Sequence, residues 1–243
     1  MSTLEYRTAI RDAIAEEIER DPSVMFFGED VAVAGGVFKA TPDLHSRFGD
    51  ERVFDTPISE LALSGAAYGA AVAGMRPIVE IMFGDFMALP MDALVNQAAK
   101  FFYISNEQGT APLVMRSAVG AGGRFGAIHS QIHGTWFQGI PGLKIVCAAT
   151  PASAKGLLKA SIRDDNPVIF LEHKRLYSVK GEPPSEEVLP LGKAVDDDLP
   201  QAGARALTGA GGGHARLAAR GCRSLPRSPT RAPPRRPASA PTR

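Results

Sequence analysis

The apolar positions of this chain change their spacing several times, and each change predicts an element. In residues 1–21 apolar side chains recur at the spacing of one helix face, which predicts an amphipathic first helix. Short apolar runs typical of buried strands occupy residues 24–30, 52–55, 76–82, 112–118, 143–149 and 167–174. Helical patterns separate these runs, one beginning at Ser59 and others covering residues 86–105 and 151–164.

This alternation predicts an α/β fold, a parallel sheet with helices on both faces. In open sheets of this class the ligand binds beyond the carboxyl ends of the strands. The loops of residues 28–36, 56–60 and 120–129 would gather at that edge. A binding site is therefore expected among these three loops.

Residues 54–60, FDTPISE, end a strand-like run and place a carboxylate at the start of a helix. Thr56 or Ser59 can cap that helix, and Pro57 suits its first turn. An acid there complements the helix dipole, which by itself explains Glu60. The following residues 61–75 are mostly Ala, Gly and Ser, so the helix is thin and lets other backbone approach closely. Such a helix suits a cofactor crevice.

Composition bounds the class of protein. With 44% hydrophobic residues among 243, the chain can bury one substantial core, and it has no apolar run long enough to cross a bilayer. The N-terminus lacks the uninterrupted apolar region of a signal peptide. Cys147 and Cys222 lie far apart and suggest neither a disulfide framework nor a cysteine metal site. We therefore expect a cytoplasmic protein without membrane contact.

The end of the chain has a different composition. Residues 199–243 contain no Asp, Glu, Lys, Ile, Val, Met, Phe, Tyr or Trp, and such a segment cannot build a core. We expect a folded domain over residues 1–194 and a disordered, Ala/Arg/Pro/Gly-rich tail over residues 195–243. The tail resembles a GC-rich coding sequence read in the wrong frame. Its basic residues could contact nucleic acid, but it has no aromatic side chains to stack bases, and no nucleic-acid partner is expected.

Several motifs occur in order between Leu4 and Ala194. They are FFGEDV, GGVFKAT, FDTPISE, RPIVEIMFGDFM, DALVNQAAKF, GAGGRFGAIHSQ, IPGLKIV, AKGLLKASIRDDNPVIFLEHK and YSVKGE. Together they resemble the β subunit of the thiamine-diphosphate-dependent E1 component of 2-oxo acid dehydrogenase complexes, above all its pyruvate and acetoin branches. From Val195 onward the resemblance fails, where that family continues into a second α/β domain. The resemblance thus implies the pyrimidine domain of a thiamine-diphosphate-binding fold in a C-terminally truncated or frameshifted chain.

The resemblance also implies roles for three residues. Glu60 falls on the acid that hydrogen-bonds the aminopyrimidine ring of thiamine diphosphate and activates it. Phe86 aligns with the aromatic residue that stacks on this ring, although Phe83, three residues away, is an equal candidate from the residues alone. His129 aligns with the histidine that serves proton transfer and meets the lipoyl group. The implied activity is oxidative decarboxylation of a 2-oxo acid with transfer of the acyl group to lipoyl, an oxidoreductase reaction.

Two other interpretations of the 120–133 loop are weaker. His133 lies four residues after His129, and such a pair could hold a metal on one helix face. No neighbouring acid completes a HExxH-type site, and the glycines before His129 favour a loop. The glycines of residues 120–126 also lack the GxGxxG spacing that opens a helix in nucleotide-binding folds.

The resemblance further implies a potassium ion bound largely through main-chain oxygens. The corresponding positions here are Leu113, Ser161, Ile162, Asp164 and Asn166. Main-chain ligands leave almost no side-chain signature. An ordinary turn between a helix and a strand explains the same residues equally well.

Partners follow from a missing motif. The family holds magnesium and the cofactor diphosphate with a GDG-type motif, which this chain lacks. The resemblance implies that a separate E1 α subunit supplies it in an α2β2-type assembly, and that the chain is active only with that subunit. It also implies a lipoyl-bearing E2 acyltransferase as partner and a small 2-oxo acid or acetoin as substrate. Two alternatives stay open: a truncated, non-catalytic domain unable to assemble, and a transketolase-like enzyme.

Overall fold

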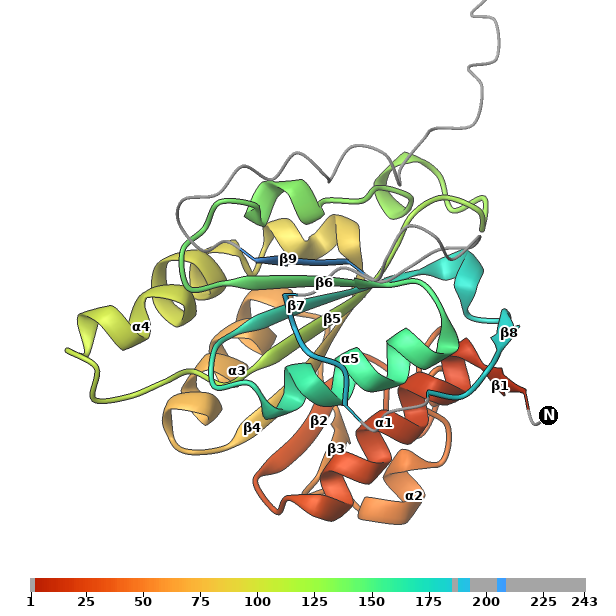
Figure 1. Cartoon of the computed structure of the whole chain (residues 1–243), viewed down its shortest axis with the longest axis horizontal. Helices are drawn as coiled ribbons and strands as arrows, with labels where there is room; N and C mark the ends of the chain where they lie inside the picture. Colours follow the sequence, from red (N-terminus) through yellow and green to blue (C-terminus); the bar gives the residue numbers. More distant parts are fainter. Residues whose placement is uncertain (1–2, 185–187, 193–204, 209–243) are drawn as a thin grey trace, which may run out of the picture. The chain divides into compact units, whose positions relative to one another are not determined.

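The computed structural model describes residues 3–184, 188–192 and 205–208, and in this part a single large sheet forms the centre. Its strand order is β3-β2-β4-β5-β7-β6-β9 (Figure 1). The strands are β2 (Val24–Gly28), β3 (Val53–Asp55), β4 (Arg76–Phe83), β5 (Val114–Val119), β6 (Lys144–Ala148), β7 (Val168–His173) and β9 (Arg205–Thr208). All neighbouring pairs are parallel except β6 with β9.

Helices connect the parallel strands, as the sequence predicted. They are α1 (Tyr6–Arg20), α2 (Leu44–Phe48), α3 (Glu60–Val72), α4 (Ala99–Ile104) and α5 (Pro151–Arg163). Shorter helical turns are η1 (Gly84–Ala88), η2 (Ala93–Ala98), η3 (Ala127–His129), η4 (Gly134–Phe137) and η5 (Lys174–Leu176). Outside the large sheet, β1 (Leu4–Glu5) pairs with β8 (Lys180–Gly181). None of the helices in the described residues is long and apolar enough to span a membrane.

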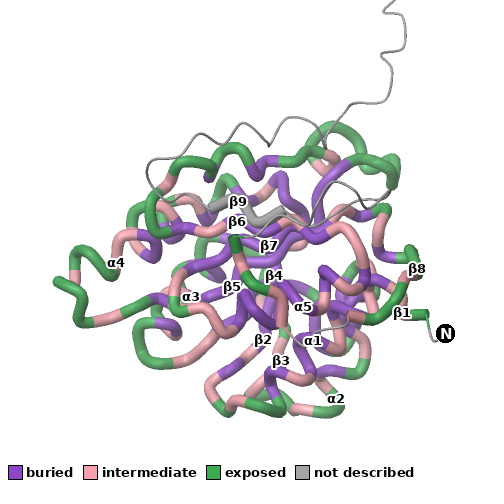
Figure 2. The backbone as a smooth tube through the Cα atoms, viewed as in Figure 1, coloured by how far each residue is buried: buried purple, intermediate pink, exposed green. Residues whose placement is uncertain are grey.

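Two hydrophobic clusters cover the two faces of the sheet. Successive residues of β7 alternate between them: Phe170 packs in the cluster that includes α1 and α5, and Leu171 packs in the one that includes α3 and η2. Strands buried on both faces read as continuous apolar runs, which is why the sequence showed them clearly. Figure 2 shows buried backbone concentrated in these central strands. The predicted parallel sheet with helices on both faces is confirmed.

A buried ionic network ties three central strands together. Arg116 of β5 donates from Nε and Nη2 to the carboxylate of Glu172 on β7, each at 2.8 Å, and from Nη1 to Glu80 on β4. The hydroxyl of Tyr177 donates to Glu172 at 2.9 Å. Burial raises the pKa of Glu80, although the arginine opposes that shift. The guanidinium of Arg116 therefore compensates the charge of both buried carboxylates, Glu80 and Glu172.

Two local expectations need correction. Ser59 stands at the N-cap of α3, but no side-chain cap bond forms there. The single helix expected over residues 86–105 is broken at Pro90, which lacks an N–H donor. The turn η1 lies before this break, and η2 and α4 follow it without interruption. Within the tail the structure describes only β9, which pairs with the edge of β6. The other residues of the 195–243 tail lie outside the described part of the chain.

Candidate active site

The expected site loops lie at one edge of the sheet, because β2 to β7 run parallel and their carboxyl ends coincide. The loop after β3 leads into α3, η1 follows β4, the glycine-rich loop follows β5 and η5 follows β7. Glu60, Phe86 and His129 belong to the first three of these connections.

Glu60 is the first residue of α3 and is only 8% exposed. Its neighbour is Glu29, a buried residue that directly follows β2. Burial raises the pKa of the Glu29 carboxyl, and repulsion by Glu60 raises it further. Oε1 of Glu29 and Oγ1 of Thr56 are both buried without a hydrogen-bond partner in the structure. The loops therefore bring together an acidic pair and polar atoms that are free to bind a ligand.

His129 contacts both phenylalanines that competed in the sequence. Its ring centroid lies 5.3 Å from that of Phe86 and 4.6 Å from that of Phe83, in edge-to-face arrangements. Phe83 is 7% exposed and belongs to the core, whereas Phe86 is partly exposed. Phe86 is thus the more accessible of the two rings, in agreement with its assignment, although its role stays a prediction.

The loop that carries His129 is anchored on both sides. Asp85, next to Phe86, accepts hydrogen bonds through Oδ1 from the backbone and side-chain nitrogens of Gln131, at 3.3 and 2.8 Å. Lys174 donates from Nζ to the carbonyl oxygen of His129. The backbone N–H of Gly120 donates to the carbonyl of Gln131 at 3.0 Å, which closes the loop.

Sequence reasoning missed Glu29, Asp85 and Lys174 as site residues. Each directly follows a strand or lies in the first turn after one, at the carboxyl edge where ligands bind in this class. That position was the signal that could have identified them. The pairings among them come from the tertiary structure and have no counterpart in local sequence.

His133 and His129 belong to different turns of the backbone. The turn η3 ends at His129, and η4 begins at Gly134, so the two histidines do not share a helix face. His133 is buried and stacks on Trp136 with ring centroids 3.8 Å apart. Within the described residues, no cluster of three or more His, Cys, Asp or Glu side chains could hold a metal ion.

The positions named for potassium are engaged in protein hydrogen bonds. Arg76 donates from Nη1 to the carbonyls of Ile162 and Asp164, at 3.1 Å each. The carbonyl of Leu113 accepts from the N–H of Val168, and that of Ser161 accepts from the N–H of Asp164. Asn166 donates to the carboxylate of Asp164, which also pairs with Lys144. These bonds explain all five positions without an ion, and the potassium ion stays a prediction.

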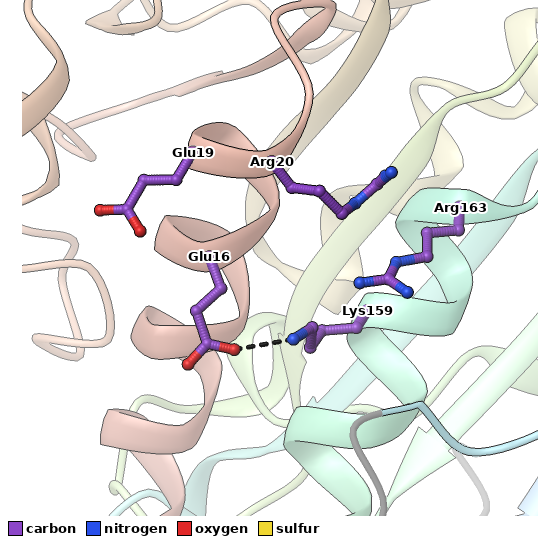
Figure 3. A pocket seen from close by; sticks show the side chains of 5 residues that line it. All are labelled: Glu16, Glu19, Arg20, Lys159 and Arg163. Carbon is purple, nitrogen blue, oxygen red and sulfur yellow. Dashed lines mark hydrogen bonds and ion pairs between the residues drawn. The ribbon is translucent and has the colours of Figure 1, made fainter.

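A separate pocket of about 430 Å³ lies between α1 and α5 (Figure 3). Its lining is charged and consists of Glu16, Glu19, Arg20, Lys159 and Arg163. Lys159 donates to Glu16 at 2.8 Å, and Arg163 pairs with Glu17 at 2.7 Å. These pairs explain the charges as links between the two helices, and none of the predicted site residues lines the pocket.

Residues 2–180 match the family described as the pyrimidine-binding domain of transketolase. The chain belongs to this family. Among solved structures, the pyrimidine domain resembles a split-gene transketolase in an inactive β4 tetramer, with a TM-score of 0.62 and 19% identity over 79% of this chain and 57% of the other. It also resembles transketolase from Leishmania mexicana, with a TM-score of 0.59 and 16% identity over 77% and 27%. At these identities the likeness shows the fold alone.

Curated relatives are much more similar in sequence. A 2-oxoisovalerate dehydrogenase subunit beta from Bacillus subtilis is 50% identical over 80% of this chain and 60% of its own length. A pyruvate dehydrogenase E1 component subunit beta from Gracilaria tenuistipitata is 51% identical over 76% and 58%. An acetoin:2,6-dichlorophenolindophenol oxidoreductase subunit beta from Cupriavidus necator is 48% identical over 79% and 60%. This pyrimidine-domain chain thus spans about three fifths of the length of these relatives.

Proposed function

We propose that this chain supplies the pyrimidine-binding half of the active site in an E1-type 2-oxo acid or acetoin dehydrogenase. The observation that carries the proposal is the buried carboxyl of Glu60 at the start of α3, at the sheet edge where His129 and Phe86 meet. High identity to β subunits of pyruvate, 2-oxoisovalerate and acetoin enzymes supports the same class of reaction.

The residues present fit the ring end of thiamine diphosphate. Glu60 offers a shielded carboxyl group for a ring nitrogen, and Phe86 offers an accessible aromatic face. The unpartnered oxygens of Glu29 and Thr56 offer further hydrogen-bond partners nearby. Thiamine diphosphate, when bound, serves as the electron sink for decarboxylation.

The proposal assigns the diphosphate and its magnesium to a partner, because the sequence has no GDG motif. Large apolar side chains exposed near the site edge support such a partner: Ile58 is 80% and Leu61 60% exposed. Large apolar side chains this exposed are typical of a surface that another protein covers. We infer an E1 α subunit in an α2β2-type assembly, which works with a lipoyl-bearing E2 acyltransferase. The cytoplasmic location of this chain stays a prediction.

Each side chain then has a separate task. Glu60 offers its buried carboxyl group to the aminopyrimidine ring and shares a proton with it. Phe86 orients the ring by packing against it. His129 exchanges a proton with the reacting group during transfer of the acyl unit to lipoyl.

The test is co-expression with a candidate α subunit and an assay on the purified complex. The panel contains pyruvate, branched-chain 2-oxo acids, acetoin and a ketose phosphate, each with and without thiamine diphosphate. The proposal predicts cofactor-dependent turnover of a 2-oxo acid or acetoin. Turnover of the ketose phosphate alone would support the transketolase-like alternative. Failure to form any complex would support the non-catalytic alternative.

A further inference from the structure

Residues 173–175, at the end of β7, support the glycine-rich loop at three points. A Cβ at Gly120 would overlap the imidazole of His173, and a Cβ at Gly122 would lie 2.5 Å from Cγ of Arg175. Between them, Lys174 binds the carbonyl oxygen of His129. The loop therefore lies directly on this segment, and Lys174 makes the contact closest to the histidine.

The ammonium group of Lys174 is fixed from several sides. The residue is only 9% exposed, although lysines are seldom buried. Its Nζ lies 5.0 Å from the ring centroid of Phe83 and 5.8 Å from that of Phe125, within the range of cation–π attraction. Burial lowers the pKa of Lys174, and the charge of Asp85 opposes that shift. Burial and these contacts hold the ammonium group of Lys174 in one position.

Lys174 and Asp85 hold the two ends of one short stretch. Asp85 binds the backbone of Gln131, and Lys174 binds the backbone of His129 two residues earlier. The imidazole of His129 then lies edge to face with Phe83 and Phe86. Because the carbonyl and the ring belong to one residue, a fixed backbone limits where the ring can point.

We propose that Lys174 is a positioning residue that holds the imidazole of His129 beside Phe86 for proton and acyl transfer. The inference rests on the proposed function of His129. Displacement of a reacting group by about 1 Å can cost on the order of a hundredfold in rate, so loss of this single anchor affects the step that uses His129. Lys174 acts through His129 and does not itself contact the substrate in this account.

The experiment uses the complex with the α subunit and compares Lys174→Gln, Lys174→Arg and Lys180→Gln. Lys180 is an exposed lysine nearby and is the matched control. Three quantities are measured: acyl transfer to a lipoyl domain, decarboxylation with an artificial electron acceptor, and amide hydrogen exchange of residues 120–131.

For Lys174→Gln we expect kcat of acyl transfer to fall by about 10- to 100-fold with little change in KM, and decarboxylation to fall less. Hydrogen exchange of residues 120–131 becomes faster, while exchange of the central strands stays the same. Lys174→Arg restores part of the transfer rate because it retains a charged donor. Lys180→Gln matches the wild type. Added to His129→Ala, Lys174→Gln causes no further loss of transfer.

Unchanged loop exchange and unchanged transfer in Lys174→Gln would overturn the proposal. Faster exchange throughout the domain, an equal loss in both reactions and no rescue by arginine would also overturn it, since they indicate a general structural role. A wild-type complex without turnover of any substrate would contradict the proposed function. In that case the loop exchange of Lys174→Gln still tests the anchoring by itself.

Discussion

Glu60 raises the pKa of Glu29 by charge repulsion at the carboxyl edge of the sheet, in addition to the larger effect of burial. Glu29 follows β2 and Glu60 begins α3, so the fold alone brings these two carboxyl groups together. The raised pKa of Glu29 favours retention of a proton on its carboxyl group, beside the acid proposed to contact the cofactor ring.

The first prediction is that Glu29→Gln changes how stability depends on pH. A raised pKa means that the folded protein binds more protons than the unfolded chain between about pH 4.3, the ordinary value, and the pKa in the folded state. Wild-type stability therefore declines as pH rises through this interval. Glutamine does not titrate, so the variant gains stability relative to the wild type across the same interval.

Urea unfolding of both proteins from pH 4 to pH 8 measures this difference. The exposed residue Glu51 provides the control Glu51→Gln, for which no such trend is expected. A constant difference between Glu29→Gln and the wild type at every pH would contradict the assigned pKa direction.

The second prediction concerns the ionic network in the sheet. Arg116→Met leaves the buried carboxylates of Glu80 and Glu172 without their cation, and we expect a loss of about 3–5 kcal/mol in the free energy of unfolding. Arg47 pairs with Glu19 on the surface at 2.6 Å, and Arg47→Met should cost less than about 1 kcal/mol. Denaturant titration of both variants checks the contrast. Similar losses would refute the role of burial.

The third prediction separates backbone conformation from steric contact in the glycine-rich loop. Gly120 and Gly126 both have positive φ, at 87° and 81°, so alanine strains each by about 1–2 kcal/mol. Only at Gly120 would the new Cβ also overlap His173, whereas Gly126 has open space around it. Thermal unfolding should therefore show a greater loss for Gly120→Ala than for Gly126→Ala. Equal losses would place the loop away from His173.

Sequence patterns were sufficient for the sheet and for most of its helices. The buried runs of β4 and β7 are continuous and apolar, and α5 has a Thr150–Pro151 start, so local signals agreed with the fold. The interruption at Pro90 was overlooked within a strong helical pattern. The short strand β9 forms by pairing with the edge of β6, and the local sequence does not show that this edge is available.

The candidate site was predictable only in part. Glu60, Phe86 and His129 came from family resemblance, and the structure brings Phe86 and His129 into ring contact. The sequence does not predict Lys174 and Asp85 as site residues, because their role depends on hydrogen bonds to the loop of residues 120–131. In the sequence, a buried lysine or aspartate cannot be distinguished from an exposed one. Only the tertiary structure shows which of them is buried.

The fourth prediction separates the tasks of Phe86 and His129. Phe86→Leu removes an aromatic face and should weaken binding of thiamine diphosphate by about 0.5–1.5 kcal/mol, measured by calorimetry on the α/β complex. His129→Ala should leave that affinity nearly unchanged but slow acyl transfer to lipoyl by about 10²–10⁴-fold. Equal effects of both substitutions on every step would argue against separate roles.

Proton exchange at C2 of bound thiamine diphosphate tests the central claim most directly, with Glu60→Gln compared to the wild type in the α/β complex. Circular dichroism and cofactor affinity first establish that fold and binding persist. If the buried carboxyl of Glu60 activates the cofactor, Glu60→Gln slows exchange by about a hundredfold or more. An unchanged exchange rate would remove Glu60 from the mechanism and contradict the account.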